Sequence, residues 1–158
     1  MSVSEDEFRA VLGRFPSGVT VVTTTDFAGA DQGMTVSAFC SVSLHPPLVL
    51  ISIEKTASAH EALTKSEGFV VNILSARQEQ VGRRFSIVDI DRFDGVGFTR
   101  SGRGYPVLDD VLGVIECSRH KLYDGGDHTI IIGEVEAMRA ESGTPLLYYR
   151  GGYAQLEH

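Results

Sequence analysis

The last third of the chain contains three strand-like runs in succession, with no helix-forming segment between them. The runs cover residues 111–123, 129–140 and 145–149, and short turns that contain glycine separate them. A parallel, doubly wound sheet requires a crossover helix between successive strands. The sequence therefore argues against that arrangement and predicts a mostly antiparallel barrel with flanking helices.

The earlier part of the chain supplies the remaining strands. Residues 19–25 are rich in valine and threonine, residues 69–74 form an apolar run, and residues 34–44 alternate loosely. Residues 48–53 form a continuous apolar run, which is typical of a strand in the middle of a sheet. The two prolines after His45 interrupt the pattern, because proline donates no hydrogen bond to a strand ladder. The sequence therefore predicts six or seven strands in the whole chain.

Three segments have the spacing of a capping box, in which a serine side chain and the side chain three residues later each satisfy a backbone N–H group. The sequence therefore predicts helices after Ser4, after Ser58 to about residue 66, and after Ser75 to about residue 85. The first helix has apolar residues at the spacing of one helical face, namely Phe8, Val11, Leu12 and Phe15.

Composition limits the class of protein. We expect one domain over residues 1–155, and we interpret residues 156–158 as the remnant of an affinity tag. No apolar run is long enough to span a bilayer, and the acidic N-terminus does not resemble a signal peptide. We therefore expect a cytoplasmic protein without a membrane partner. A net charge of -7 without a basic cluster argues against nucleic acid as a partner.

The two cysteines and five histidines show no metal-binding spacing, so no metal site is predicted. Cys40 and Cys117 lie far apart in apolar, strand-like sequence, and free cysteine is usually buried. We expect both to be reduced, buried thiols. We expect His45 in a turn and His120 on a solvated strand face.

Residues 55–60 form the first candidate binding segment. They follow a predicted strand and lead into the helix expected after Ser58, and free backbone N–H groups at a helix start attract anions such as phosphate. Lys55 adds positive charge, while Thr56 and Ser58 add hydroxyl groups. The alternative is that Ser58 only caps the helix, since capping boxes are common.

Residues 34–41 form the second candidate. Their small and hydroxylated side chains follow a strand, and small residues allow a flat ring to approach the backbone. The alternative is a serine-rich edge strand without a ligand. The glycine-rich motifs of dinucleotide and nucleotide triphosphate sites are absent from the sequence, so those sites have no support.

His128 and residues 148–153 are the remaining candidates. A turn made by Gly126 and Asp127 places His128 at the start of a strand, from which its imidazole can project over the end of the sheet. The alternative is a structural or exposed histidine, and no motif marks it as a hydrolase base. The tyrosines beside Arg150 can stack on a planar ligand, or they can pack at a strand end.

Taken in order, these segments resemble the flavin reductase-like family, the reductase components of two-component flavin-dependent monooxygenases. The resemblance runs from about Phe8 to Tyr153 and is weak between Asp89 and Gly104. Its specificity lies in the order of the segments rather than in any one of them. The matching segments are 15–24, 33–39, 41–49, 55–60, 69–74, 126–135 and 148–153.

The resemblance implies a mainly β fold, an antiparallel split β-barrel with a Greek-key core and short flanking helices, which binds FMN or FAD and usually forms a homodimer. The flavin ring would contact Thr35, Val36, Ser37, Ala38, Cys40 and Ser41. The ribityl-phosphate side would contact Ser52, Ser58, Ala59 and His60, and an apolar contact would come from Phe85. The nucleotide NADH or NADPH would meet Tyr149, Arg150, Tyr153 and the catalytic residue His128.

The activity that the resemblance implies is an NAD(P)H:flavin oxidoreductase, which reduces FMN or FAD by hydride transfer and supplies the reduced flavin to a partner monooxygenase. Hydride transfer needs alignment of the nicotinamide with the flavin rather than a strong acid or base, which agrees with the lack of an evident catalytic constellation. The alternative is a split-barrel module that binds flavin or haem without turnover. A third possibility, an oxidase of a pyridoxine-like substrate, is disfavoured because the sequence has no further basic cluster for a substrate phosphate.

Overall fold

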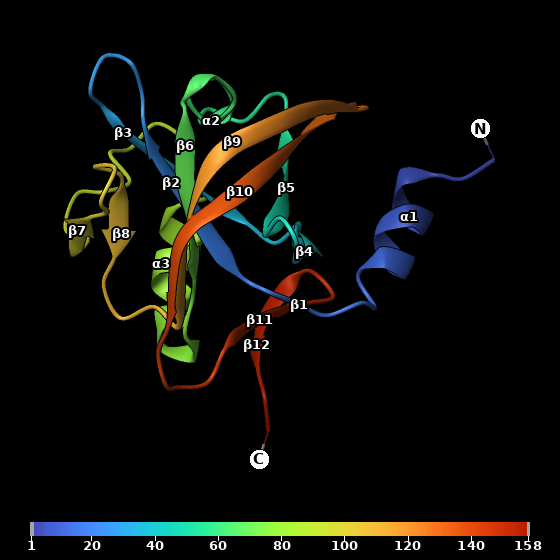
Figure 1. Ribbon diagram of the computed structural model, residues 1–158. Coiled ribbons are helices and arrows are strands. Elements are labelled where there is room, and N and C mark those ends of the chain that lie inside the picture. Colours follow the sequence, from blue (N-terminus) through green and yellow to red (C-terminus); the bar gives the residue numbers. More distant parts are fainter. Residues whose placement is uncertain (1, 158) are drawn as a thin grey trace.

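The computed structural model describes residues 2–157 and is built around one seven-stranded sheet (Figure 1). The strands lie in the order β3-β2-β6-β9-β10-β5-β4, and every neighbouring pair is antiparallel. Their bounds are β2 Thr20–Thr25, β3 Asp31–Val36, β4 Phe39–Ser43, β5 Leu48–Glu54, β6 Gly68–Ile73, β9 Gly113–Gly125 and β10 His128–Ala140. The predicted mainly β, antiparallel architecture is confirmed.

The sheet curls so that its two edge strands, β3 and β4, come close together without pairing. β3 and β4 lie at opposite ends of the strand order, yet only Ser37 and Ala38 separate them in the chain. A linker of this length spans at most about 10 Å, so the two edges lie side by side. The N–H group of Ser52 on β5 donates to the carbonyl oxygen of Ala38 over 3.0 Å. No ladder joins β3 to β4 among the described residues, so the barrel is split, and the linker crosses the split.

Two apolar clusters lie on the two faces of the curled sheet. The cluster inside the barrel includes Val71 and Ile131, and the cluster on the outer face includes Val70 and Leu74. Successive residues of β6 serve different clusters because neighbouring side chains of a strand point to opposite faces. Burial on both faces explains why the strands of this chain read as continuous apolar runs.

Short strands add to the barrel. β7 Phe98–Arg100 pairs with β8 Pro106–Leu108, and a three-stranded sheet contains β1 Ser17–Gly18, β11 Leu146–Tyr149 and β12 Gly152–Gln155. The buried side chain of Asn72 holds β8 in place. Its Oδ1 accepts from the N–H of Leu108 over 2.9 Å, and its Nδ2 donates to the carbonyl of Val21 over 2.9 Å. The sequence prediction missed β1, β7, β8 and β12, which have two to four residues each.

Two of the three predicted capping boxes form. Ser4 caps α1 Glu5–Leu12, and Ser75 caps the 3-10 turn η1 Ala76–Gln78 that precedes α3 Glu79–Arg84. The capping prediction for Ser58 is wrong, because α2 His60–Lys65 begins after Ala59 and no side chain caps it. Successive turns lead into α2, since the N–H of Ala57 donates to Glu54 and the N–H of His60 donates to Ala57. These turns leave Ser58 outside the helix.

The α1 helix projects from the body of the chain (Figure 1), and none of its residues is buried. Just beyond its end, the carbonyl of Gly13 accepts from the N–H of Arg150 over 3.0 Å. An apolar helical face is usually covered by another surface, because its exposure to water is unfavourable. The exposed fractions are 60% for Phe8, 68% for Val11, 53% for Leu12 and 79% for Phe15.

The two cysteines are free, but their burial differs from the prediction. Cys117 is buried as expected, and burial raises the pKa of its thiol to about 12. The prediction for Cys40 is wrong, because its side chain is exposed on the edge strand β4. His45 lies in a turn and His120 is exposed on β9, as predicted.

No helix within residues 2–157 combines the length and the apolar character needed to cross a membrane. His158, the last residue of the predicted tag remnant, lies outside the described residues.

Candidate functional site

The stretch from Thr35 to Ser41 follows the split of the barrel. Four of its side chains are exposed, those of Ser37, Ala38, Cys40 and Ser41. Val36 is only 4% exposed and points into the barrel core, so its side chain has little surface for a ligand. Because Ser52 donates to the Ala38 carbonyl, the structure brings Ser52 next to this stretch, as the predicted site requires.

A cavity of about 620 Å³ opens beside the split, between β3, the residues around the end of α3 and the β11–β12 hairpin. Its volume is in the range of small-molecule sites. Three of the predicted site residues line it, namely Thr35, Ser37 and Tyr153. Tyr148, Gly151 and Gly152 also line it and belong to the candidate segment 148–153, whereas the sequence prediction missed Val19, Arg83, Ser86 and Ile87.

The α3 helix and the residue after it hold Thr35 in place. The N–H of Thr35 donates to the carbonyl of Phe85 over 3.2 Å, and its Oγ1 donates to the carbonyl of Gly82 over 2.7 Å. The Phe85 ring is 1% exposed and meets the Phe93 ring edge-on, with 5.1 Å between centroids. Phe85 therefore supports the edge of β3 from behind and offers almost no surface for the predicted contact with a ligand.

Arg83 and Tyr153 form the charged end of the cavity. The Arg83 guanidinium lies 5.0 Å from the centre of the Tyr153 ring, and Tyr153 meets Tyr148 edge-on at 5.6 Å. A cation above an aromatic ring is attracted to it. Burial raises the pKa of the Tyr153 hydroxyl. The cavity thus combines a positive charge with two aromatic rings, a chemistry that suits an anionic ligand with a flat ring.

The other two predicted residues of the C-terminal segment do not line this cavity. Tyr149 and Arg150 are exposed at the turn between β11 and β12, where Arg150 adopts a φ of 52°. The N–H of Arg150 donates to the carbonyl of Gly13. The segment that was predicted as one nucleotide contact is therefore divided between the cavity and the hairpin turn.

His128 begins β10, as predicted, and pairs with Glu54 of β5, two residues along from Ser52. Its Nδ1 lies 2.7 Å from Oδ1 of Asp127. The hydrogen bond with His128 is the main cause that lowers the pKa of the Asp127 carboxyl. The side chain of His128 is 38% exposed. The Asp127 contact thus fixes the imidazole at one nitrogen and leaves the ring accessible to a ligand.

Residues 55–60 are engaged in contacts within the protein. Lys55 forms an ion pair with Asp124, and this hydrogen bond and charge lower the pKa of the Asp124 carboxyl. The Nε2 atom of His60 lies 2.8 Å from Oγ1 of Thr129. Ala59 is buried in the barrel core. Because α2 has six residues, its start also has little helix dipole to attract an anion.

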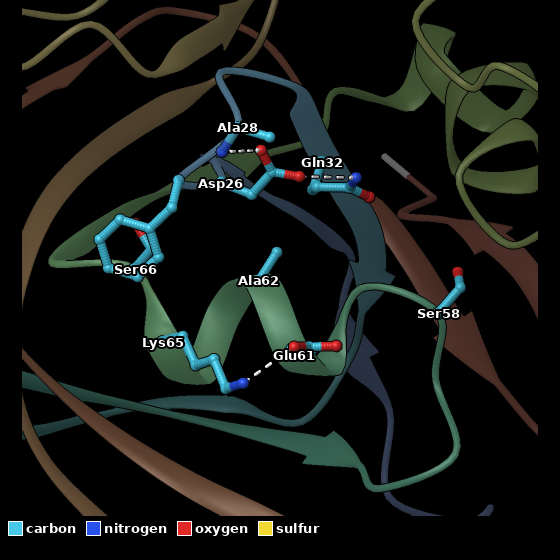
Figure 2. Close-up of a pocket in the computed structure, with 9 residues that line it drawn as sticks. Asp26, Ala28, Gln32, Ser58, Glu61, Ala62, Lys65 and Ser66 are labelled. Atoms are coloured by element: carbon cyan, nitrogen blue, oxygen red, sulfur yellow. Dashed lines mark hydrogen bonds and ion pairs between the residues drawn. The ribbon is translucent and has the colours of Figure 1, made fainter.

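Ser58 lines a separate cavity of about 330 Å³, which lies between the β2–β3 turn and α2 (Figure 2). The polar groups of this cavity are largely satisfied by one another. The Asp26 carboxylate accepts from the N–H of Ala28 over 3.0 Å, and Lys65 is paired with Glu61 over 2.8 Å. None of the other predicted site residues lines this cavity, so Ser58 is separated from the rest of the predicted site.

Two further observations narrow the set of residues that form the candidate site. No group of three potential metal ligands occurs within residues 2–157. A larger cavity of about 1010 Å³ lies beside η1 and residues 108–112, and it contains none of the predicted site residues. The barrel split, the adjoining cavity and the His128 strand end are therefore the candidate site.

Known proteins are similar to this chain over nearly its whole length, including the candidate site. A model of the flavin reductase like domain family matches residues 12–157. The chain is 42% identical over 147 residues to a flavin reductase from Pseudomonas putida. That alignment covers 92% of this chain and 86% of the relative. It is 39% identical over 157 residues to the flavin-dependent monooxygenase reductase subunit HsaB of Rhodococcus jostii (strain RHA1). That alignment covers 99% of this chain and 80% of HsaB.

Solved structures give a similar result. The Streptomyces globisporus C-1027 NADH:FAD oxidoreductase SgcE6, in complex with NAD and FAD fragments, superposes with a TM-score of 0.93 and 38% identity. That match covers 98% of this chain and 93% of the other. The flavin reductase PheA2 superposes with a TM-score of 0.89 and 40% identity, over 99% and 100% of the two chains. The similarity thus covers the whole barrel rather than one motif.

Proposed function

Because the chain belongs to the flavin reductase like domain family, we propose that it is an NAD(P)H:flavin oxidoreductase, which reduces FMN or FAD by hydride transfer from NADH or NADPH. The observation that carries this function is the continuity of the site. The exposed linker at the split contributes Ser37 to the cavity, and its Ala38 is bonded to Ser52 on the strand that pairs with His128. One extended ligand pair can therefore contact all three parts.

The residues at the split fit a flavin ring. Their small, exposed side chains permit close approach of a flat ring, and an edge strand offers N–H and carbonyl groups to the polar edge of that ring. A bound flavin supplies the redox chemistry by accepting the hydride. The protein binds the ring, orients it and keeps one face open for the nicotinamide.

His128 has the role of positioning the nicotinamide. Its ring is held by Asp127 at Nδ1 and is partly exposed at the strand end beside the split. Alignment of the two reacting rings is the main contribution that a protein makes to this kind of hydride transfer. The role of His128 is therefore to bind and orient, and it needs no proton transfer.

A homodimer is part of the proposal. The exposed apolar residues of α1, which are Phe8, Val11 and Leu12, support it together with Phe15 just beyond the helix, because water does not stabilise exposed apolar side chains. A second copy of the chain supplies a surface of matching size and character by symmetry. The flavin site near this interface, a single domain over residues 1–155 and a location in the cytoplasm belong to the same proposal.

The reduced flavin is supplied to a partner monooxygenase. Relatives of this chain are reductase subunits of such systems, among them HsaB and the stachydrine N-demethylase reductase subunit Stc3 of Rhizobium meliloti. The exposed position of the split supports this role, because a flavin that is bound at an open edge can leave after reduction.

The steady-state rate with each pairing of FMN or FAD with NADH or NADPH tests the proposed activity. We expect consumption of the nucleotide to depend on added flavin in at least one pairing. A protein that binds flavin without consuming nucleotide in any of the four pairings would instead be the split-barrel binding module.

A further inference from the structure

The imidazole of His128 makes one hydrogen bond within the described residues, and its partner is the residue before it. Nδ1 of His128 lies 2.7 Å from Oδ1 of Asp127. Neighbouring side chains within a strand point to opposite faces and cannot meet in this way. Asp127 can reach the ring because it belongs to the turn before β10 rather than to the strand itself.

The main chain holds Asp127 in this position. Its carbonyl accepts from the N–H of Lys55, just beyond the end of β5, over 2.9 Å. The residue before it, Gly126, adopts a φ of 80°, a conformation that is costly for residues other than glycine. A turn that is fixed on both sides thus presents the Asp127 carboxylate to one nitrogen of the His128 ring.

This contact determines which nitrogen of His128 carries a proton. The hydrogen bond with His128 is the main cause that lowers the pKa of the Asp127 carboxyl, so this side chain is an ionised carboxylate. A carboxylate only accepts hydrogen bonds, and Nδ1 is therefore the donor. In a neutral imidazole one nitrogen carries the proton and the other is an acceptor. Nε2 thus has a free lone pair, and no group within residues 2–157 donates to it.

His128 and Ser52 emerge on the same face of the sheet. In the pairing of β10 with β5, Ile130 lies opposite Ser52, and residues two apart on a strand share a face. The N–H of Ser52 donates to Ala38 in the linker that crosses the split. The free Nε2 therefore belongs to a side chain on the face of the sheet where we place the flavin ring.

We propose that Asp127 is a positioning residue that keeps Nε2 of His128 unprotonated, so that Nε2 accepts a hydrogen bond from the carboxamide N–H group of the reduced nicotinamide. The inference rests on the proposed reductase function and adds the direction of this hydrogen bond. With the proton on Nε2, the ring would instead donate to the carboxamide oxygen. Only the first arrangement distinguishes a carboxamide from a ketone, because a ketone has the oxygen but no N–H group.

Nitrogen NMR of isotope-labelled histidine measures the tautomer in the free protein, without turnover. The signals of His128 are assigned by their loss in His128→Gln, and a pH on the alkaline side of neutrality keeps an imidazole uncharged. We expect a protonated Nδ1 and an unprotonated Nε2. In Asp127→Asn this preference should weaken, because an amide can also donate to Nδ1. A proton mainly on Nε2 in the unchanged protein would overturn the proposal.

The selectivity for the carboxamide provides a second test. It is the ratio of kcat/KM for the preferred reduced nucleotide to that for its acetylpyridine analogue, which has a methyl ketone in place of the carboxamide. Comparison of this ratio between proteins cancels the different reactivity of the two nucleotides. Asp127→Asn should lower the ratio about three- to tenfold, the value of one hydrogen bond. His128→Ala should lower it similarly, and Asp127→Asn should have no further effect in that background.

Asp124→Asn is the matched control, since it makes the same change to an exposed carboxylate of the same hairpin, which is paired with Lys55 instead of His128. It should leave the ratio as it is in the unchanged protein. A constant ratio in Asp127→Asn, or an equal fall in Asp124→Asn, would contradict the proposal. Failure of the unchanged protein to oxidise either nucleotide would instead contradict the proposed function, and the NMR measurement would still determine the tautomer.

Discussion

Nε2 of His60 lies 2.8 Å from Oγ1 of Thr129, which ties the residue that begins α2 to the strand residue after His128. The two residues are 69 positions apart in the chain. This contact holds the end of β10 against α2 and so fixes the position from which His128 projects. It also engages Nε2 of His60, a residue that the family resemblance places on the ribityl-phosphate side of the flavin.

Thr129→Val should destabilise the fold without changing flavin affinity. Valine keeps the shape of threonine but removes the hydroxyl, and the loss of one half-buried hydrogen bond costs about 1 kcal/mol. For a chain of this size that corresponds to a fall in Tm of about 2–4 °C. Thermal unfolding measures the shift and fluorescence titration measures the affinity for FMN. An unchanged Tm would mean that the contact contributes nothing to stability.

His128→Ala should slow flavin reduction and spare flavin binding. Without the imidazole, the nicotinamide is held less well against the flavin, and we expect a loss of about tenfold or more in rate. His120→Ala is the control, because His120 is exposed on β9, where its Nδ1 lies 3.7 Å from a carboxylate oxygen of Glu134. Equal turnover in the two variants would contradict the role given to His128.

Acid should weaken the ion pairs around His128. Hydrogen bonds and charge from Lys55 and from His128 lower the pKa values of Asp124 and Asp127 in the folded protein. Each carboxylate therefore stabilises the fold above its ordinary pKa, and this contribution is lost as the pH falls through the lowered value. The effect is small because both groups are exposed.

The Tm of the unchanged protein and of Asp124→Asn, measured from about pH 6 to about pH 3, tests this sign. The unchanged protein should lose more stability on acidification than the variant. Parallel curves would show that the Lys55 pair has no stabilising role.

Asn72→Ala should be strongly destabilising. The Asn72 side chain bonds to the carbonyl of Val21, to Oγ1 of Thr23 and to the N–H of Leu108, and it is fully buried. Its removal leaves buried polar groups unpaired, at a cost of about 2–4 kcal/mol. Urea unfolding measures the loss. Gln80→Ala, at an exposed position of α3, is the control and should change stability little.

A charge on the apolar face of α1 should dissociate the dimer. In Val11→Asp the carboxylate would be buried against the partner subunit, whereas in Arg9→Ala the change falls on the polar side of the same helix. Sedimentation should show a monomer for the first variant and a dimer for the second. A monomeric unchanged protein, or a dimeric Val11→Asp, would contradict a dimer interface at α1.

Local patterns predicted the main elements well, and long-range contacts explain the misses. The antiparallel barrel followed from successive strands without helices, and Ser4 and Ser75 cap their helices as expected because a capping box involves only neighbouring residues. β8 was missed because a buried side chain from β6 holds it, and no local pattern shows that contact. The same reason explains Cys40, whose exposure depends on β4 being an edge strand.

The candidate site was predicted in part. Residues 35–41 lie along the split, next to Ser52, because strand order and the short linker bring them there. Arg83 was missed because the cavity forms only when α3, β3 and the β11–β12 hairpin meet, and each contributes an ordinary-looking residue. Ser58 had the right sequence for an anion site, but the turns before α2 place it elsewhere.

Anaerobic mixing of the protein with NADH or NADPH and free FMN or FAD tests the central claim most directly. If the protein is an NAD(P)H:flavin oxidoreductase, the visible absorbance band of the oxidised flavin should disappear, because the hydride reduces the isoalloxazine ring. Admission of air should restore the band. Persistence of the band with both nucleotides and both flavins would contradict the assignment.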